Sequence, residues 1–280
     1  MKLGIRLESL GLPLRKGLDQ AARMAAAGVQ IDATGDLSPD RISQTGRRDF
    51  VNLLRSLNLE LAALNCPLRR GLDVAENLQP RIEHVRKTMS LSYDLGARIT
   101  IVEMPRIPEE AKPEMEAAPA AVGRLILATA PLAADPARIL RESLADLGKF
   151  GDRVGASLAL EIGLDPAEKL ADYLAGFDSG ALGVNYDPAN MYINGFDPIQ
   201  SLTTLHGKIL YTQGRDARRS GVSRVAAETP LGAGDIDWMT YIGALDALEY
   251  RGWISVKRES GERRIDDVAN GVSFLRRFIR

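Results

Sequence analysis

The segments Ser157-Leu-Ala-Leu-Glu-Ile162 and Leu182-Gly-Val-Asn-Tyr-Asp-Pro-Ala-Asn190 have the same form. Each is a short apolar run that ends on a carboxylate, Glu161 in the first and Asp187 in the second. Strands that are buried on both faces of a parallel sheet read as near-continuous apolar runs. We therefore predict that the two segments are consecutive strands of a parallel sheet. Glu161 and Asp187 are expected at the carboxyl ends of those strands.

Six further runs of this kind alternate with longer segments of helical character. A helix is predicted from Leu14 to Ala27, because its apolar residues recur at helical spacing. Gly28 and Gly96 are predicted to be glycines that end helices, and Asp237 is predicted to cap the start of one. The further predicted strands are Leu3 to Leu7, Val29 to Ala33, Glu60 to Leu64, Arg98 to Glu103, Lys208 to Thr212 and Trp253 to Lys257.

Eight strands that alternate with helices indicate a parallel sheet wrapped by helices. The eightfold repeat predicts a single (β/α)8 TIM barrel over residues 1–280, a usual length for this fold. An open, doubly wound sheet is the alternative. It would more often show a Gly-rich dinucleotide-binding turn after an early strand, and the sequence has no such turn.

Composition sets limits on the class of protein. Lys plus Arg total 36 and Asp plus Glu total 37, so the formal net charge is -1. A near-neutral chain has no general attraction for nucleic acid or for an anionic membrane. The single cysteine, Cys66, excludes an intrachain disulfide and fits a reducing compartment. The first residues lack the features of a signal peptide, and no apolar stretch approaches the roughly 20 residues of a membrane helix. We expect a cytoplasmic protein.

One connection is too long for a compact barrel. The segment from Met104 to about Ala137, which follows the fourth predicted strand, is rich in Ala, Pro and Glu. Long loops in compact domains are usually functional or disordered. Because this loop follows the carboxyl end of a strand, it is expected to overhang the active-site end of the barrel as a lid. A surface insertion without function is the alternative.

Polar side chains also stand at the ends of the last two strands. Gln213 ends the seventh and Lys257 ends the eighth. Catalytic groups of TIM barrels project from the carboxyl ends of the strands. Together with Glu161 and Asp187, these residues are therefore expected to face one cavity. The alternative is structural: carboxylates that cap loops, an amide that ties loops together and a solvated lysine.

These segments resemble the xylose-isomerase-like barrel family from end to end. That family includes sugar isomerases, ketose epimerases and, more distantly, a metal-dependent DNA-repair endonuclease. No single motif is decisive, but the order and spacing of several together are specific. The matching segments are Gly28-Val-Gln-Ile-Asp32, Leu95-Gly-Ala97, Leu160-Glu161, Asp187-Pro-Ala-Asn190 and Pro230-Leu-Gly-Ala-Gly-Asp-Ile-Asp-Trp238.

The resemblance implies a divalent metal held by a Glu, an Asp, a His and a second Glu. The first two positions fall on Glu161 and Asp187, but the histidine position falls on Gln213 and the second glutamate on Lys257. An amide oxygen is a weak ligand for a transition metal and an ammonium is no ligand. We therefore expect no cofactor. The Lys257 amine should replace the ion, within salt-bridge distance of Glu161 or Asp187. Binding of Mn, Mg or Zn through Glu161 and Asp187 alone is the lesser alternative.

The histidines agree with this expectation. The chain has two, His84 within a predicted helix and His206 on the amino-terminal side of the seventh strand. Neither position lies at the expected active-site end. A nuclease with a cluster of histidine-bound metals is therefore excluded.

The predicted function is a sugar or sugar phosphate isomerase or epimerase. Glu161 would remove a proton next to a carbonyl, and Lys257 would stabilise the developing negative charge or return the proton. Two alternatives stay open: a non-catalytic carbohydrate-binding or metabolite-binding barrel, and a lyase or dehydratase in which Lys257 forms a Schiff base. A homo-oligomer is also left open. The residues expected to bind substrate are Asp187, Gln213, Asn190, Arg6, Arg69 and Arg215.

Overall fold

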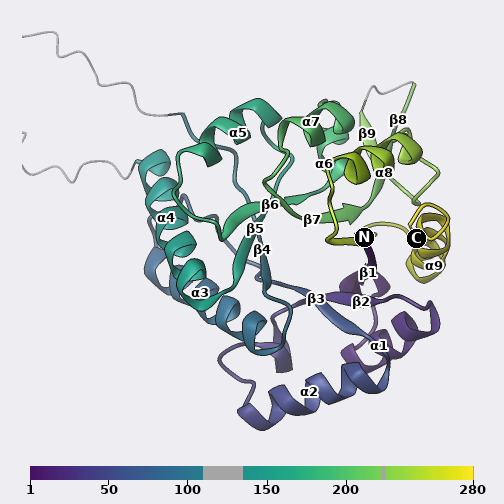
Figure 1. Cartoon of the computed structure of the whole chain (residues 1–280), viewed down its shortest axis with the longest axis horizontal. Coiled ribbons are helices and arrows are strands. Elements are labelled where there is room, and N and C mark those ends of the chain that lie inside the picture. Colours follow the sequence, from purple (N-terminus) through teal and green to yellow (C-terminus); the bar gives the residue numbers. More distant parts are fainter. Residues whose placement is uncertain (110–134, 222–224, 280) are drawn as a thin grey trace, which may run out of the picture.

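The computed structural model describes residues 1–109, 135–221 and 225–279. Eight parallel strands close into a barrel in the order β1-β10-β7-β6-β5-β4-β3-β2. Helices surround the strands on all sides (Figure 1). The predicted (β/α)8 barrel is therefore confirmed. Its strands are β1 (Lys2–Arg6), β2 (Gly28–Asp32), β3 (Glu60–Asn65), β4 (Ile99–Glu103), β5 (Ser157–Glu161), β6 (Leu182–Tyr186), β7 (Ile209–Gly214) and β10 (Trp253–Val256).

The helices begin at positions that the sequence marks. Asp135, Asp187, Asp197 and Asp237 each accept a hydrogen bond from a backbone N–H of the helix that follows, which satisfies donors that a helix start leaves free. The capping role predicted for Asp237 is thus confirmed. No helix in the described ranges is both long and apolar enough to cross a membrane. The helices are α1 (Leu14–Arg23), α2 (Gln44–Ser56), α3 (Leu78–Asp94), α4 (Pro136–Val154), α5 (Ala167–Ala175), α6 (Pro188–Ile193), α7 (Pro198–Thr204), α8 (Trp238–Ala247) and α9 (Arg264–Leu275), with 3-10 turns η1 (Leu7–Leu10) and η2 (Gly35–Leu37).

The prediction for Gly28 is wrong. Helix α1 ends at Arg23, and Ala25 takes the positive φ, 55°, in the turn after it. Gly28 is instead the first residue of β2, where a Cβ atom would lie 2.6 Å from the Trp253 ring. The glycine is therefore needed for close packing inside the barrel. Gly96 does follow the end of α3 with a φ of 87°, as predicted.

The interior of the barrel changes from apolar to polar along the strands. Ala62, Ala63, Ile101, Ala159 and Tyr211 form a small buried cluster of their own. Because successive side chains of a strand point to opposite faces, the residues two positions beyond Ala63, Ile101, Ala159 and Tyr211 also point inward. Those residues are polar, and they lie at the carboxyl ends of the strands.

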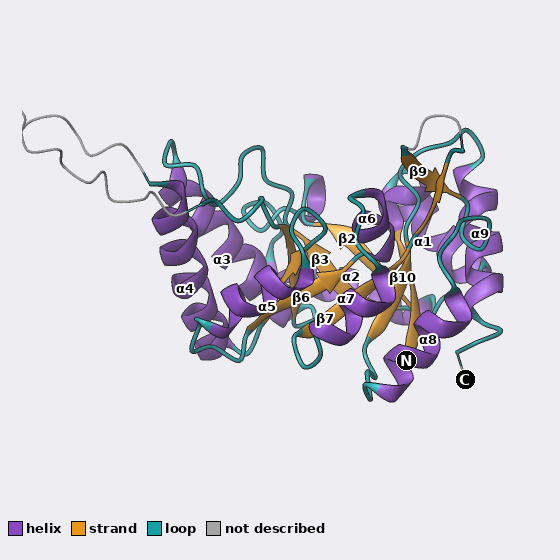
Figure 2. Cartoon of the chain, turned by 90° about the horizontal axis from the view of Figure 1, so that it is seen from above, coloured by secondary structure: helices purple, strands orange, loops and turns teal. Residues whose placement is uncertain are grey.

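The sequence did not predict one element. A two-stranded antiparallel hairpin, β8 (Asp216–Arg219) and β9 (Ala226–Thr229), follows β7 directly. Figure 2 shows β9 on the side of the barrel away from the N-terminus, which is the side of the strands' carboxyl ends. Most of the segment expected to form a lid, residues 110–134, lies outside the described residues.

Candidate active site

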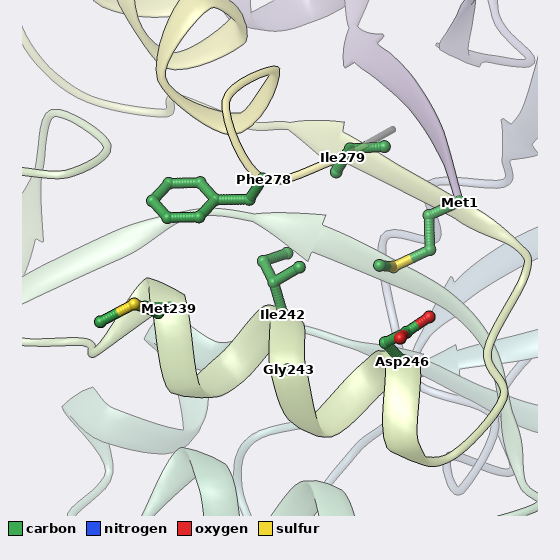
Figure 3. Close-up of a pocket in the computed structure, with 7 residues that line it drawn as sticks. All are labelled: Met1, Met239, Ile242, Gly243, Asp246, Phe278 and Ile279. Carbon is green, nitrogen blue, oxygen red and sulfur yellow. The ribbon is translucent and has the colours of Figure 1, made fainter.

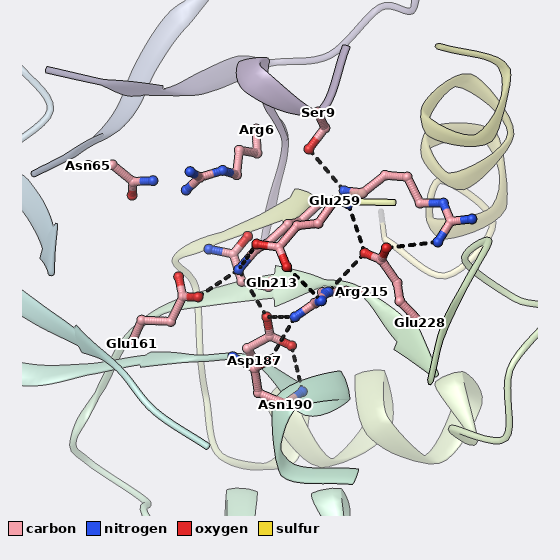
Figure 4. Close-up of polar contacts among 12 residues, drawn as sticks. Arg6, Ser9, Asn65, Glu161, Asp187, Asn190, Gln213, Arg215, Glu228 and Glu259 are labelled. Carbon is pink, nitrogen blue, oxygen red and sulfur yellow. Dashed lines mark hydrogen bonds and ion pairs between the residues drawn. The ribbon is translucent and has the colours of Figure 1, made fainter. Parts of the chain in front are cut away.

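The four strand-end side chains predicted from the sequence come together at one end of the barrel, and Figure 4 shows three of them, Glu161, Asp187 and Gln213. Lys257 follows β10, and its Nζ lies 2.6 Å from Glu161 Oε1 and 3.3 Å from Asp187 Oδ2. Both distances are within ion-pair range, as expected. Gln213, in β7, reaches the same group through Asn185, which donates to Glu161 Oε2 at 2.9 Å.

The Lys257 amine is charged. Burial by itself would lower its pKa, but the carboxylates of Glu161, Asp187 and Glu259 outweigh that effect and raise the pKa above its ordinary value of 10.5. Glu259 Oε1 is the third partner, at 3.1 Å. The ammonium therefore donates hydrogen bonds to Glu161 and Asp187 and forms a further ion pair with Glu259.

Asp187 is also charged, although it is fully buried. Burial would raise its pKa, but Lys257 and Arg215 hold the pKa below its ordinary value of 3.8. One carboxylate oxygen accepts the backbone N–H of Asn190 at the start of α6, and the other lies 3.3 Å from both cations. A buried charge is stable only when paired and hydrogen-bonded, and Asp187 meets both conditions.

A second cation lies beside the first. Arg215, directly after β7, is buried and contacts Asp187, Asn190, Glu228 and Glu259, at 2.6–3.3 Å. The carboxylate of Glu259 therefore bridges two cations, with Oε2 at 2.7 Å from Arg215 and Oε1 at 3.1 Å from Lys257. Glu259 is half exposed, whereas the other two carboxylate partners of Lys257 are buried or nearly so.

A relay of buried amides connects this site to the far side of the barrel. Gln213 Nε2 donates both to Asn185 at 3.1 Å and to Gln30 at 3.0 Å, and Gln30 in turn donates to Asn65 at 2.8 Å. Asn65 donates to Asp32 at 3.0 Å. Since every amide in the relay donates outward from Gln213, the relay ends on a carboxylate at each side. These amides occupy inward positions of their strands, but sequence reasoning singled out only Gln213.

The remaining predicted residues divide into two groups. Asn190 and Arg215 line the same cleft as Glu161 and Lys257. Arg6, at the end of β1, instead pairs with Asp32 at the end of the neighbouring strand β2, at 3.1 Å. Arg69 is exposed after β3, and it is not among the residues that line the cleft.

The cleft at this end of the barrel has a volume of about 260 Å³. Gly163 forms part of its wall with a φ of 150°, and a Cβ atom there would lie 2.5 Å from the Cβ of Asn190. The glycine thus lets the loop after β5 lie close to α6. The charged residues that line the cleft are Glu103, Glu161, Glu259, Arg215 and Lys257.

The unpredicted hairpin fixes the loop after β10. Glu228, in β9, accepts hydrogen bonds from Arg215, from Arg258 and from the backbone N–H groups of Glu259 and Ser260, at 2.8–2.9 Å. Burial would raise the pKa of Glu228, but the Ser260 hydroxyl, which donates to it at 2.6 Å, and the other donors hold the pKa below its ordinary value of 4.5. The hairpin therefore positions both Arg215 and Glu259.

These side chains do not suit the divalent metal that the resemblance implied. The Lys257 ammonium lies between the two carboxylates that would share the ion. The Gln213 amide nitrogen is held by two acceptors, and its buried oxygen has no hydrogen-bond partner in the described part of the chain. Within residues 1–109, 135–221 and 225–279 no group of three or more His, Cys, Asp or Glu side chains has a geometry for a metal.

The two histidines lie away from this site. His84 is in α3 and its nearest carboxylate, Asp40, is at 3.9 Å. His206 is in the turn before β7, at the amino-terminal end of the barrel. Neither histidine lines the cleft around Lys257.

The charge network predicts how stability depends on pH. The folded-state pKa values of Asp187 and Glu228 lie below their ordinary values of 3.8 and 4.5. Such carboxyl groups stabilise the fold above the ordinary pKa, and that stabilisation is lost as pH falls through the folded-state pKa. We expect the free energy of unfolding, measured by denaturant titration, to fall as pH drops below about 4.5. Asp187→Asn should make this fall shallower. Equal slopes in the two proteins would contradict the prediction.

A larger hollow, of about 420 Å³, lies between α8 and the residues that follow α9 (Figure 3). Its lining includes Met1, which precedes β1, and Asp246, which lies near the end of α8. Apolar side chains such as Met239 and Phe278 also line it. Asp246 is the one ionisable side chain among the lining residues, so the hollow holds no group of catalytic side chains. The cleft around Lys257 is therefore the candidate active site.

Solved structures of low sequence identity share this fold. A xylose isomerase domain protein from Planctomyces limnophilus matches 93% of this chain and 91% of its own with a TM-score of 0.77 and 19% identity. The 3-keto-D-glucoside 4-epimerase of E. coli covers 99% of each chain with a TM-score of 0.72 and 16% identity. A D-allulose 3-epimerase from Methylomonas sp., solved in complex with D-allulose, covers 99% of this chain and 96% of its own with a TM-score of 0.69 and 16% identity.

Sequence comparison gives the family. No curated protein matches the chain at a significant level. The family described as the xylose isomerase-like TIM barrel matches residues 18–278, which is nearly the whole chain and includes every residue of the cleft. The chain therefore belongs to the xylose isomerase-like TIM barrel family.

Proposed function

We propose that this protein interconverts isomers of a small unphosphorylated sugar by proton transfer, with a lysine in place of a metal. The observation that carries the proposal is the 2.6 Å contact between Lys257 Nζ and Glu161 Oε1 in the wall of the cleft. Sugar isomerases and epimerases are the class of enzyme that the family membership supports. Sugar binding in the same fold, as in the complex with D-allulose, supports the class of substrate.

Glu161 is the proposed base. Its carboxylate lines the cleft and its side chain is 12% exposed, so a substrate can reach it. Lys257 and Asn185 each hold one of its oxygens, which fixes the orientation of the carboxylate. Each oxygen keeps further lone-pair capacity for a proton. A base held in this way can remove a proton from a carbon next to a carbonyl.

Lys257 is proposed to stabilise the enediolate that this step creates. A fixed positive charge in a site of low water content stabilises developing negative charge strongly. The ammonium is paired with three carboxylates, and Glu259 is the most exposed of the three partners. We propose that a substrate oxygen takes the place of Glu259. The same displacement would free the Arg215 N–H groups that contact Glu259 at 2.7 Å.

The charges of the cleft favour a substrate without phosphate. Three carboxylates and two cations line it, and both cations are already paired with carboxylates. A phosphate group would bring further negative charge close to Glu103, Glu161 and Glu259. Of the two sugar classes predicted from the sequence, the unphosphorylated one therefore fits better.

A Schiff base on Lys257 is the less favoured chemistry. That reaction needs a neutral amine, and the surrounding carboxylates raise the pKa of Lys257 above 10.5. The amine would also have to leave three ion pairs. A lyase of this type therefore conflicts with the local electrostatics.

One experiment separates the proposal from its competitors. Protein dialysed against EDTA is incubated in D2O with D-allulose, D-fructose and D-tagatose, and products and deuterium incorporation are followed by NMR. We expect turnover of at least one sugar with deuterium at the carbon next to the carbonyl, at the same rate with and without EDTA. Glu161→Gln should lose both signals.

The competing functions give different results. Calorimetric binding without exchange would identify a non-catalytic binder. Activity lost to EDTA and restored by Mn²⁺ would show that a metal is required after all. Trapping of a covalent adduct on Lys257 with borohydride would identify the Schiff-base lyase.

A further inference from the structure

Glu103 is a second carboxylate in the same cleft that the proposed chemistry has not yet used. It ends β4, and its Cα is in register with that of Glu161 at the end of β5. The backbone pairing continues one residue further, because Met104 N donates to Glu161 O at 2.9 Å. The relative position of the two glutamates is thus set by the sheet.

The two side chains also point the same way. Ile101 and Ala159 lie two positions earlier in β4 and β5, and both belong to the cluster inside the barrel. By the alternation of side chains along a strand, Glu103 and Glu161 both point toward the barrel axis, and both line the cleft. Neighbouring strands lie about 4.8 Å apart, so the two carboxylates lie on the same side of a bound substrate.

Glu103 differs from the other carboxylates of the cleft in its contacts. Glu161 is held by Lys257 and Asn185, and Glu259 by Lys257 and Arg215. Within the described ranges the carboxylate of Glu103 has no hydrogen bond or ion pair, and its side chain is exposed to the cleft. Both of its oxygens are therefore available to a hydroxyl group of the substrate.

We infer that Glu103 moves the hydroxyl proton in an aldose–ketose isomerisation, while Glu161 moves the carbon-bound proton. This inference rests on the proposed function and specifies the reaction that it catalyses. Interconversion of a ketose and an aldose needs two proton transfers, one between carbons and one between oxygens. Epimerisation next to the carbonyl needs only the transfer at carbon, but requires proton donors on opposite faces.

The steps balance as follows. Glu161 removes a proton from C1 of the ketose, the C1–H electron pair forms the C1=C2 bond, and the carbonyl pair moves onto O2. Glu103 accepts the proton of the O1 hydroxyl and delivers it to O2. Collapse of the O1 anion re-forms a carbonyl at C1, and Glu161 returns its proton to C2 on the same face. The product is the aldose, and both carboxylates are regenerated.

Lys257 is not suited to the oxygen-to-oxygen transfer. Its ammonium cannot accept a proton, and the three carboxylates around it make it a weak acid. Its place in the scheme is to stabilise the charge on O2 while Glu103 carries the proton. The two residues thus have separate roles on opposite sides of the Glu161 carboxylate.

Glu103→Gln tests the inference through two signals, deuterium exchange and aldose formation. If Glu103 had only a structural role, both signals would change together. With D-fructose, D-allulose and D-tagatose in D2O, NMR reports deuterium exchange at C1 of the ketose and formation of the aldose. The variant should keep the exchange, because Glu161 and Lys257 are intact. It should form aldose about 10²-fold more slowly or worse, as loss of a general acid–base group does. Glu103→Asp should recover part of the rate.

Controls make each outcome decisive. Glu161→Gln should lose both signals, and Glu168→Gln, an exposed glutamate in the first turn of α5, should lose neither. Equal loss of exchange and aldose formation in Glu103→Gln, or no loss of either, would overturn the inference. So would a parent that forms only ketose epimers, although the proposed function would then stand. A parent that shows no exchange with any sugar would instead refute the proposed function.

Discussion

Replacing Lys257 with methionine is expected to lower kcat by about 10²- to 10³-fold, the usual effect of removing one charge-stabilising group from an active site. The substitution keeps most of the volume of the side chain but removes the ammonium that contacts Glu161 and Asp187. KM should change less than kcat, because the ammonium acts on charge that develops in the transition state. Steady-state kinetics with the sugar identified in the exchange experiment measures both constants.

The same substitution should also destabilise the fold. Asp187 is fully buried and Glu161 nearly so, and their charges would lose a partner. Breaking a buried ion pair from one side costs about 3–5 kcal/mol. Arg215 stays within 3.3 Å of Asp187 and should reduce the loss. Denaturant titration measures the change in free energy of unfolding.

Lys2→Met is a matched control for this variant. Lys2 also pairs with a glutamate, Glu60, at 2.7 Å, but at the other end of the barrel and with both side chains exposed. Exposed pairs contribute only about 0–1 kcal/mol, so both kcat and stability should stay close to those of the parent. A Lys257→Met protein with the parent's kcat would show that Lys257 is a structural lysine.

The paired substitution Gln213→His with Lys257→Glu is expected to create a metal site that the parent lacks. It supplies the two donors missing from the Glu, Asp, His and Glu set that the family resemblance implied, beside Glu161 and Asp187. It also changes the local charge by two units at the position of the ammonium. At about 4 Å each unit charge acts on a neighbour with roughly 1–4 kcal/mol, depending on the dielectric. We expect Mn²⁺ or Zn²⁺ to bind with a Kd of about 1 µM, or about −8 kcal/mol.

Three measurements check this prediction. Elemental analysis should find one metal per chain in the double variant and less than stoichiometric metal in the parent. Calorimetry should give the Kd. Without metal the new glutamate would lie among Glu161, Asp187 and Glu259 and repel them, so added metal should raise the melting temperature of the double variant and not that of the parent.

The single variants serve as controls. Gln213→His keeps the Lys257 ammonium and should bind no ion. Lys257→Glu lacks the imidazole and should bind more weakly than the double variant. A parent that already binds one dication tightly through Glu161 and Asp187 would refute the metal-free mechanism.

Much of the fold could be predicted from local sequence. Apolar runs of strand length, helical periodicity and capping aspartates such as Asp237 are short-range signals, because each reflects the surroundings of a few consecutive residues. The strand limits were correct to within a few residues. The prediction for Gly28 failed because that glycine is required by a contact with Trp253, 225 positions away in the chain, which no local pattern contains.

The candidate site was predicted in part for the same reason. Each predicted strand-end residue stands where an apolar run stops, namely Glu161, Asp187, Gln213 and Lys257. In a parallel barrel all such strand ends lie on one side. Gln213 and Lys257, which differ from the metal ligands that the family resemblance implied, could also be identified from the sequence. The position of the Arg69 side chain could not be predicted, because the sequence of a loop after a strand does not show where its side chains point.

Residue types and their order along the chain were enough to establish a parallel barrel with a lysine among strand-end carboxylates. Only closure of the barrel decided which residues these side chains contact. Gln213 meets Gln30 across 183 positions and Lys257 meets Glu161 across 96, and the unpredicted hairpin brings Glu228 to Arg258 and to the loop after β10. Hydrogen bonds and ion pairs depend on distances of about 3 Å, and the distances between remote segments follow from the packing of the whole sheet.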